Sequence, residues 1–310
     1  MKTRKVTVFK RGFTLMELMV AMAITAIIVT VLVSITSIAI DTWNRSRAEL
    51  RASRQAKAMV DTMASDFQSL VTRSGTVGTA DNLIDPEWLS AIGDPSPDGG
   101  STNAAELIFF SAATDRYNGD IGPNSTVDKG GDVSCIAYRL NYKDPISQGG
   151  TYKTFVLNRL LVNPDQTFKD LLAKPDLSTA FQGGYSSQLD NIKNFVCENV
   201  FQFTLTFHVD VTNTNSGTGA QTIEHKTVTI GQGSGQMTRS FKIKGSGIDT
   251  TASDAAVLKS GRLTAVGISL TVLTDSGVDL LRHNSSKAGD AAWLAKNSYN
   301  YSKLVQLPSM

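Results

Sequence analysis

Residues 13–40 read FTLMELMVAMAITAIIVTVLVSITSIAI, and this stretch decides how the rest of the chain is interpreted. From Leu18 to Ile40 it contains 23 residues without a charge, a glycine or a proline. At about 1.5 Å of rise per residue, a helix of that length extends roughly 35 Å, which exceeds the ~30 Å hydrocarbon layer of a bilayer. The sequence therefore predicts a transmembrane helix over residues 18–40.

The twelve residues before this stretch read MKTRKVTVFKRG and carry five basic side chains and no acidic one. Because basic residues stay on the cytoplasmic side, we expect a cytoplasmic N-terminus and the bulk of the chain across the membrane. An ordinary secretory signal peptide has an apolar region of only ~7–15 residues, so that alternative is disfavoured. A plain signal anchor leaves Glu17 unexplained, because a carboxylate near the start of a membrane helix is costly unless it is paired.

Residues 10–18, KRGFTLMEL, resemble the type IV prepilin cleavage and methylation signal. The resemblance implies that a membrane-embedded prepilin peptidase cuts between Gly12 and Phe13 and methylates the new N-terminus. Removing twelve residues from 310 leaves a mature chain of 298 residues, in which Glu17 is the fifth. In this family we expect that acid to pair with the Phe13 amine of a neighbouring subunit and to set the axial register of packed helices.

The composition excludes several other classes of protein. There are 30 Lys+Arg against 28 Asp+Glu, a net charge of +2, with 19% charged and 41% hydrophobic residues. This balance excludes a disordered polyelectrolyte and argues against a nucleic-acid partner. Without the five basic residues of the leader, 25 basic residues face 28 acidic ones, so the mature side-chain charge is −3.

The apolar stretch continues into an amphipathic one, and no glycine or proline occurs between Phe13 and Arg73. An apolar stripe at helical spacing follows, formed by Ala52, Ala56, Met59, Met63, Phe67 and Leu70. The basic residues Arg45, Arg47, Arg51, Arg54 and Lys57 fit a solvated helix face better than a membrane-surface patch. We expect one helix over residues 13–73, with its transmembrane half at 18–40 and its second half carrying a folded head.

Residues 74–310 are expected to form that head, beginning with a Gly- and Pro-rich loop over residues 74–103. Alternating apolar residues predict strands in the remainder, near 106–113, 136–142, 153–162, 201–211, 222–230 and 263–274. A short helix is expected over 288–296. The fold class is therefore α+β, with a long N-terminal helix packed on an antiparallel β-sheet, which is the pilin-like arrangement.

No catalytic or cofactor-binding motif is present, so we expect neither an enzyme nor a bound cofactor or metal. The turn from Asp115 to Asp120 contains oxygen ligands, but its spacing does not match a calcium-binding EF-hand loop. Two cysteines, Cys135 and Cys197, are too few for a four-cysteine zinc site. A disulfide between them and a pair of buried thiols both remain open.

The order of the later segments resembles J-type minor pseudopilins of type II secretion, and also pseudopilin-like proteins of verrucomicrobial gene cassettes. The resemblance rests on Asp66-Phe67 and on segments 133–142, 154–160, 199–205 and 263–272. It implies a structural subunit that helps to initiate or cap a periplasmic pseudopilus. Its expected partners are prepilin peptidase, the inner membrane, and other pseudopilins through the N-terminal helix. A type IV pilus minor pilin and a membrane-anchored binding module or adhesin are the alternatives.

Overall fold

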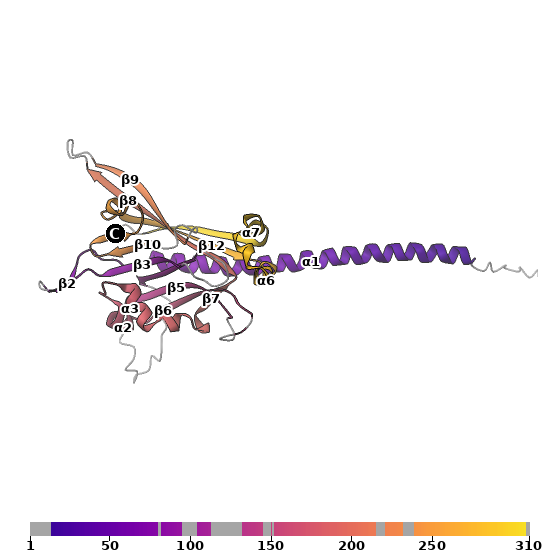
Figure 1. Ribbon diagram of the computed structural model, residues 1–310, viewed down its shortest axis with the longest axis horizontal. Coiled ribbons are helices and arrows are strands. Elements are labelled where there is room, and N and C mark those ends of the chain that lie inside the picture. The colour runs from indigo at the N-terminus through magenta and orange to yellow at the C-terminus, as the bar shows by residue number, and fades with distance from the viewer. Residues whose placement is uncertain are drawn as a thin grey trace, which may run out of the picture. The chain divides into compact units, whose positions relative to one another are not determined.

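The computed structural model describes residues 14–79, 82–94, 104–112, 132–144, 150, 152–214, 221–231 and 239–307. The chain divides into two compact units, Met1–Leu50 and Arg51–Met310. Helix α1, Leu15–Gln68, contributes residues to both units (Figure 1). In the first unit α1 is the only element among the described residues, and every residue from Thr14 to Asn44 is exposed.

The second unit contains the end of α1 and all the remaining elements. Its strands are β1 Val77–Thr79, β2 Asn82–Ile84, β3 Glu87–Asp94, β4 Ala104–Ser111, β5 Ser134–Lys143, β6 Thr154–Val162, β7 Phe195–Glu198, β8 Val200–Thr214, β9 Gln221–Ile230, β10 Ser240–Lys244, β11 Gly247–Thr250, β12 Arg262–Leu273 and β13 Ser298–Gln306. Its short helices are α2 Pro164–Gln166, η1 Thr167–Leu171, α3 Leu177–Gly184, α4 Ser186–Leu189, η2 Ile192–Asn194, α5 Ala255–Leu258, α6 Asp275–His283, η3 Ser285–Gly289 and α7 Ala291–Asn297.

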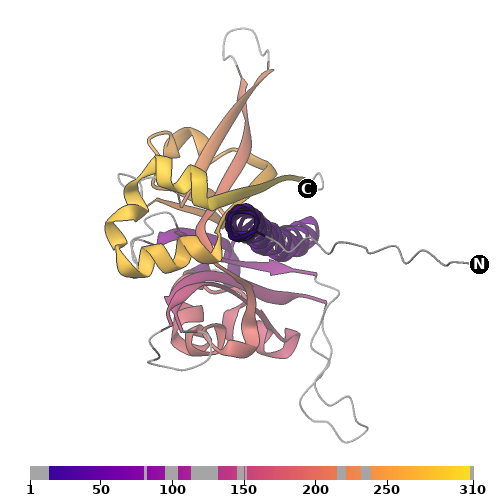
Figure 2. The same cartoon turned by 90° about the vertical axis from the view of Figure 1, so that its right-hand side faces the viewer.

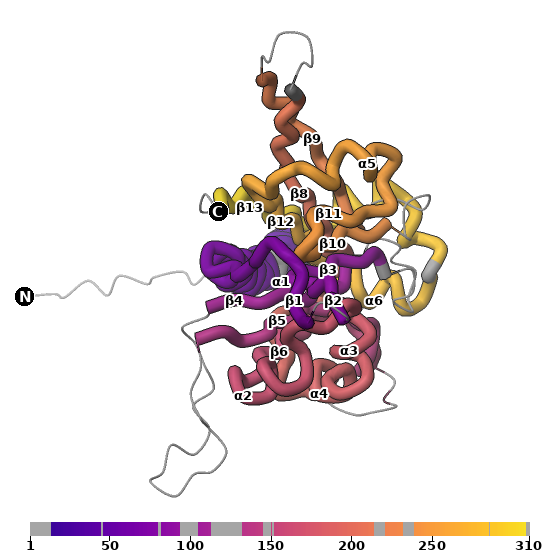
Figure 3. Tube along the Cα trace, turned by 90° about the vertical axis from the view of Figure 1, so that its left-hand side faces the viewer, coloured from indigo at the N-terminus to yellow at the C-terminus, as the bar shows by residue number. Residues whose placement is uncertain are grey.

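These strands form two main sheets. One has seven strands in the order β11-β10-β3-β4-β5-β6-β7, and the other has four in the order β13-β12-β8-β9. Every described strand pair is antiparallel, which includes the small β1-β2 pair. A long helix followed by antiparallel sheet confirms the predicted α+β class. Figure 3 shows β3, β10 and β11 side by side at one edge of the larger sheet.

The main core of the second unit lies between the end of α1 and the two sheets. The predicted apolar stripe of the helix is buried in it, with Met63 and Phe67 fully inaccessible. The ring of Phe67 stacks on Phe109 of β4 at 4.7 Å, and Phe207 of β8 stacks on Phe241 of β10 at 4.1 Å. These contacts confirm that the helix packs on antiparallel sheet through its apolar stripe.

The opposite face of the seven-stranded sheet is covered by the helical segment between β6 and β7 (Figure 2). Leu171, Leu177, Phe181 and Leu189 from this segment are fully buried against the sheet. This segment therefore closes a second hydrophobic cluster. Because both of its faces are covered, the central strands are buried on both sides, which explains the continuous burial of Ser134–Leu140.

The structure corrects the expectation that residues 74–103 are loop. This segment includes β1, β2 and β3, and β3 lies between β10 and β4 in the larger sheet. Trp88, Leu89 and Ala91 are buried there. Glycines and prolines flank this short apolar run, and they led to the prediction of a loop. Strands β10, β11 and β13 were also not predicted. Helix α1 ends at Gln68, before the expected Arg73, because Val71 donates its N–H to the carbonyl of Phe110 at 2.9 Å.

Candidate functional site

The first turn of α1 contains a reciprocal pair of hydrogen bonds between Thr14 and Glu17. The backbone N–H and the hydroxyl of Thr14 each donate to Glu17 Oε2 at 3.0 Å, and the N–H of Glu17 donates to Thr14 Oγ1 at 3.2 Å. This is a capping box, whose sequence signature is Ser or Thr followed three residues later by Glu. Thr14 and Glu17 therefore cap the N-terminal end of α1, and Glu17 has hydrogen-bond partners in its own chain. The Thr14-x-x-Glu17 spacing in the sequence encodes this local role.

The other two residues of the expected processing site, Gly12 and Phe13, lie outside the described residues. The same holds for the turn from Asp115 to Asp120, the weak calcium candidate. Where the structure does describe the chain, no group of three or more His, Cys, Asp or Glu side chains could hold a metal ion. His225 contacts Asp210 through Nδ1 at 2.6 Å, in an exposed pair on neighbouring strands.

The apolar half of α1 presents a surface that no other described residue of its unit covers. Several of its hydroxyl side chains donate within the helix: Thr25 donates to the carbonyl of Ala21 at 2.8 Å, and Thr36 to that of Leu32 at 2.8 Å. Such internal bonds let polar side chains enter a hydrocarbon environment, which offers them no partner. By length and composition, α1 is the one helix among the described residues that is able to cross a membrane, and it fits a membrane anchor.

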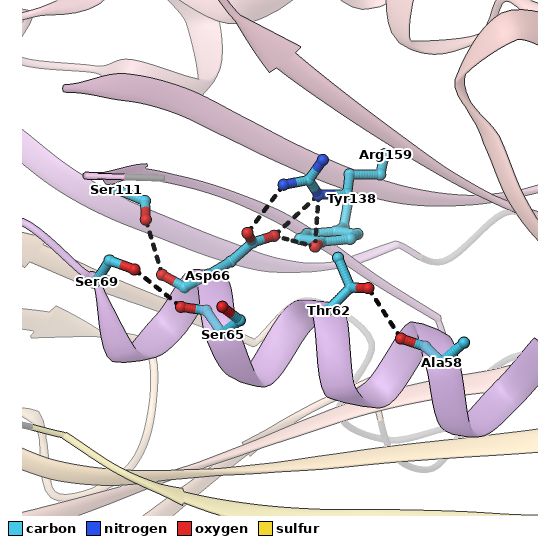
Figure 4. Close-up of polar contacts among 8 residues, drawn as sticks. All are labelled: Ala58, Thr62, Ser65, Asp66, Ser69, Ser111, Tyr138 and Arg159. Carbon is cyan, nitrogen blue, oxygen red and sulfur yellow. Dashed lines mark hydrogen bonds and ion pairs between the residues drawn. The ribbon is translucent and has the colours of Figure 1, made fainter. Parts of the chain in front are cut away.

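At the other end of α1, in the second unit, Asp66 forms a buried ionic cluster with two sheet residues (Figure 4). Arg159 of β6 donates from Nε and from an Nη nitrogen to the two carboxylate oxygens of Asp66, both at 2.9 Å. The hydroxyl of Tyr138, on β5, donates to the same carboxylate and accepts from Arg159 Nε at 3.0 Å. Tyr138 and Arg159 are direct cross-strand partners, so sheet register places both beneath the helix.

This cluster fixes the helix against the sheet at a single position. The side chains of Asp66 and Arg159 are only 5% and 11% exposed, so this ion pair is largely shielded from water. Burial, and then the adjacent Asp66 carboxylate, raise the pKa of Tyr138 well above its usual value, which keeps its hydroxyl a donor. Ser111, at the end of β4, also donates to the backbone carbonyl of Asp66 at 2.9 Å. The sequence signal for this site was Asp66, an acidic residue directly before Phe67 of the apolar stripe.

The two cysteines do not form a disulfide in this structure: both are free and buried. Cys135 pairs with Val162 and Cys197 with Leu157, two β6 positions that are five residues apart. Since strand side chains alternate, an odd separation places the thiols on opposite faces of the sheet, and five residues span roughly 16 Å. The structure thus selects the alternative of two buried thiols, and burial raises the pKa of Cys197 to about 12.

We expect both thiols to resist alkylation by iodoacetamide in the folded protein. A buried, protonated thiol is a poor nucleophile, because the thiolate is the reactive form. Mass spectrometry should find both cysteines unmodified before denaturation and both modified afterwards, with no reducing agent added. Modification that requires prior reduction would reveal a disulfide and contradict the structure.

One comparison with known proteins gives a match. The family model for the prokaryotic N-terminal methylation motif matches residues 9–33, which include Gly12, Phe13, the capping box and the first half of the apolar helix. This match supports a prepilin-like protein, and a motif of this kind implies processing by prepilin peptidase and assembly with other pilin subunits. No curated protein and no solved structure matches the chain.

Proposed function

We propose that this chain is a minor pseudopilin, which is cleaved and N-methylated by prepilin peptidase and then helps to initiate or cap a periplasmic pseudopilus for protein secretion. The observation that carries the proposal is the methylation motif at residues 9–33, which runs directly into an exposed apolar helix. Such a helix needs a membrane around it before assembly. In a filament of pilin-like subunits, packed neighbouring helices would cover the same apolar surface. The subunit is structural rather than catalytic.

The processing step explains why the helix survives maturation. A cut between Gly12 and Phe13 removes the basic leader, residues 1–12, and leaves the whole apolar stretch attached. Glycine on the leader side has no side chain to obstruct a protease cleft, and its backbone is unusually free. The product remains in the inner membrane with a single span at 18–40, a cytoplasmic N-terminal side and a periplasmic head over residues 74–310.

The capping box gives Glu17 a defined state before assembly. A carboxylate in a low-dielectric setting is strongly disfavoured unless it accepts hydrogen bonds, and here Thr14 supplies two of them. In a filament, the N-methylated amine of Phe13 from a neighbouring subunit would approach the same carboxylate. Because ammonium and carboxylate together neutralise the charge, this contact would favour one axial stagger between helices.

The test is mass spectrometry of the N-terminus of the protein purified from membranes. We expect a chain of 298 residues that starts at N-methyl-Phe13, since cleavage removes the twelve leader residues. As a control, Gly12→Val should leave the leader in place, because the branched side chain obstructs cleavage. A wild-type chain that starts at Met1, or at a site near Ile40, would refute processing by prepilin peptidase.

A further inference from the structure

A cavity of about 320 Å³ lies in the second unit, where the two main sheets meet beyond the end of α1. Four segments form it: the residues that follow α1, the β10–β11 hairpin, the start of β12, and Leu307 at the end of β13. Figure 3 views the molecule from the side where β10, β11 and β13 lie. Its volume is within the range of pockets that bind organic ligands, and exceeds what a single inorganic ion needs.

The lining of this cavity combines aliphatic and basic side chains. The aliphatic residues are Leu70, Ile243, Ile248, Leu263 and Leu307. The basic residues are Arg73, Lys244 and Arg262, and none of the described lining residues is acidic. Lys244 is already paired, since its Nζ lies 2.7 Å from Asp249 Oδ2. Among the described lining residues, the positive charge that no ion pair balances therefore comes from Arg73 and Arg262.

Within the part of the chain that the structure describes, neither arginine has a carboxylate partner. Among the described residues, no Asp or Glu oxygen lies within the 4.0 Å ion-pair distance of Arg73 or of Arg262. The backbone of Arg73 is nevertheless held in place, because Val71 donates to Phe110 at 2.9 Å and Gly75 donates to Gly245 at 2.8 Å. Arg262 begins β12 and is registered opposite Asp210 in the four-stranded sheet. Two guanidinium groups are thus positioned on ordered backbone beside an apolar cavity.

We propose that this cavity binds an acidic peptide segment of a partner protein, with a carboxylate held by Arg73 and Arg262 and a neighbouring aliphatic side chain against Leu70 and Leu263. The guanidinium fork matches the two oxygens of a carboxylate, and such charge-assisted hydrogen bonds are among the strong ones. None of the described lining residues is aromatic, so none of them offers a ring on which a base or a sugar could stack. This binding is separate from filament assembly through α1 and does not depend on the pseudopilin assignment.

The test uses the full chain in detergent micelles and a fluorescein-labelled hexapeptide of alternating leucine and glutamate. A second hexapeptide, with glutamine in place of glutamate, has the same size but no charge. We expect fluorescence anisotropy to show tighter binding of the glutamate peptide, with an affinity that falls as salt rises. The double variant Arg73→Gln/Arg262→Gln should weaken that binding by about tenfold or more, because it removes two charge-assisted contacts.

The matched control is Lys169→Gln, which removes an exposed cation from η1, a segment that does not line the cavity. It should bind the glutamate peptide as the wild type does, and all variants should unfold at the same temperature. Equal binding of the two peptides, or unchanged affinity in the double variant, overturns the proposal. Competition by inorganic phosphate or by phosphatidylglycerol micelles at peptide-like concentrations also overturns it, because the cavity would then be a phosphate or lipid-headgroup site.

Discussion

Replacing Asp66 with alanine is expected to lower the free energy of unfolding of the head by about 3–5 kcal/mol. The substitution removes the buried carboxylate that accepts two hydrogen bonds from Arg159 and one from the Tyr138 hydroxyl. Breaking a buried ion pair that is joined by two hydrogen bonds costs far more than the loss of a surface ion pair. Urea denaturation followed by tryptophan fluorescence measures the change, because Trp88 and Trp293 are both buried in the head.

The control is Asp61→Ala, in the same helix. Asp61 pairs with Lys303 at 2.6 Å, but its side chain is 66% exposed, so its loss should cost less than about 1 kcal/mol. The triple variant Asp66→Leu/Tyr138→Phe/Arg159→Met removes all the polar partners together and should be less destabilised than Asp66→Ala. Equal effects of Asp66→Ala and Asp61→Ala would mean that the cluster does not hold the helix to the sheet.

Replacing Glu17 with alanine is expected to abolish incorporation into filaments while leaving processing intact. The variant should still be cut after Gly12, because the cleavage site itself is unchanged. It loses the carboxylate that closes the capping box and that, in the proposed filament, faces the amine of a neighbouring subunit. Comparing sheared filaments with the membrane fraction by immunoblot would show the protein in the membrane only.

A matched control is Glu49→Ala, which removes another exposed acid from α1 outside the first turn. This variant should assemble as the wild type does. A second variant, Thr14→Val, disrupts the capping box but keeps the Glu17 carboxylate, and so separates the helix-starting role from the register role. Normal assembly of Glu17→Ala would refute the assignment of this residue.

Much of this molecule follows from contiguous sequence. The predicted span at 18–40 depends on the length of an uncharged run, and the apolar stripe through Met63 and Phe67 depends on helical spacing, so each can be predicted from neighbouring residues. The same applies to the long strands, such as β8, whose alternation of apolar and polar residues is regular. The Thr14–Glu17 capping box is also encoded by nearby residues, although it was identified only in the structure.

The features that escaped prediction depend on residues far apart in the chain. Strand β3 is short and flanked by glycine and proline, and it becomes a strand because β10 and β4 pair with it on either side. The cluster around Asp66 needs β5 and β6 to bring Tyr138 and Arg159 under the helix, 72 and 93 residues away in sequence. No local pattern encodes such pairings.

By itself, the sequence determined that the chain carries a prokaryotic N-terminal methylation motif, an apolar helix long enough to cross a membrane and an α+β fold, because those properties are set by composition and periodicity over short windows. Tertiary structure alone decided that Cys135 and Cys197 stay apart and that Arg73 and Arg262 line one cavity. It also decided that the Asp66 carboxylate accepts hydrogen bonds from side chains of two strands. Each of these depends on strand register, which is selected by the burial of the whole core rather than by any single segment.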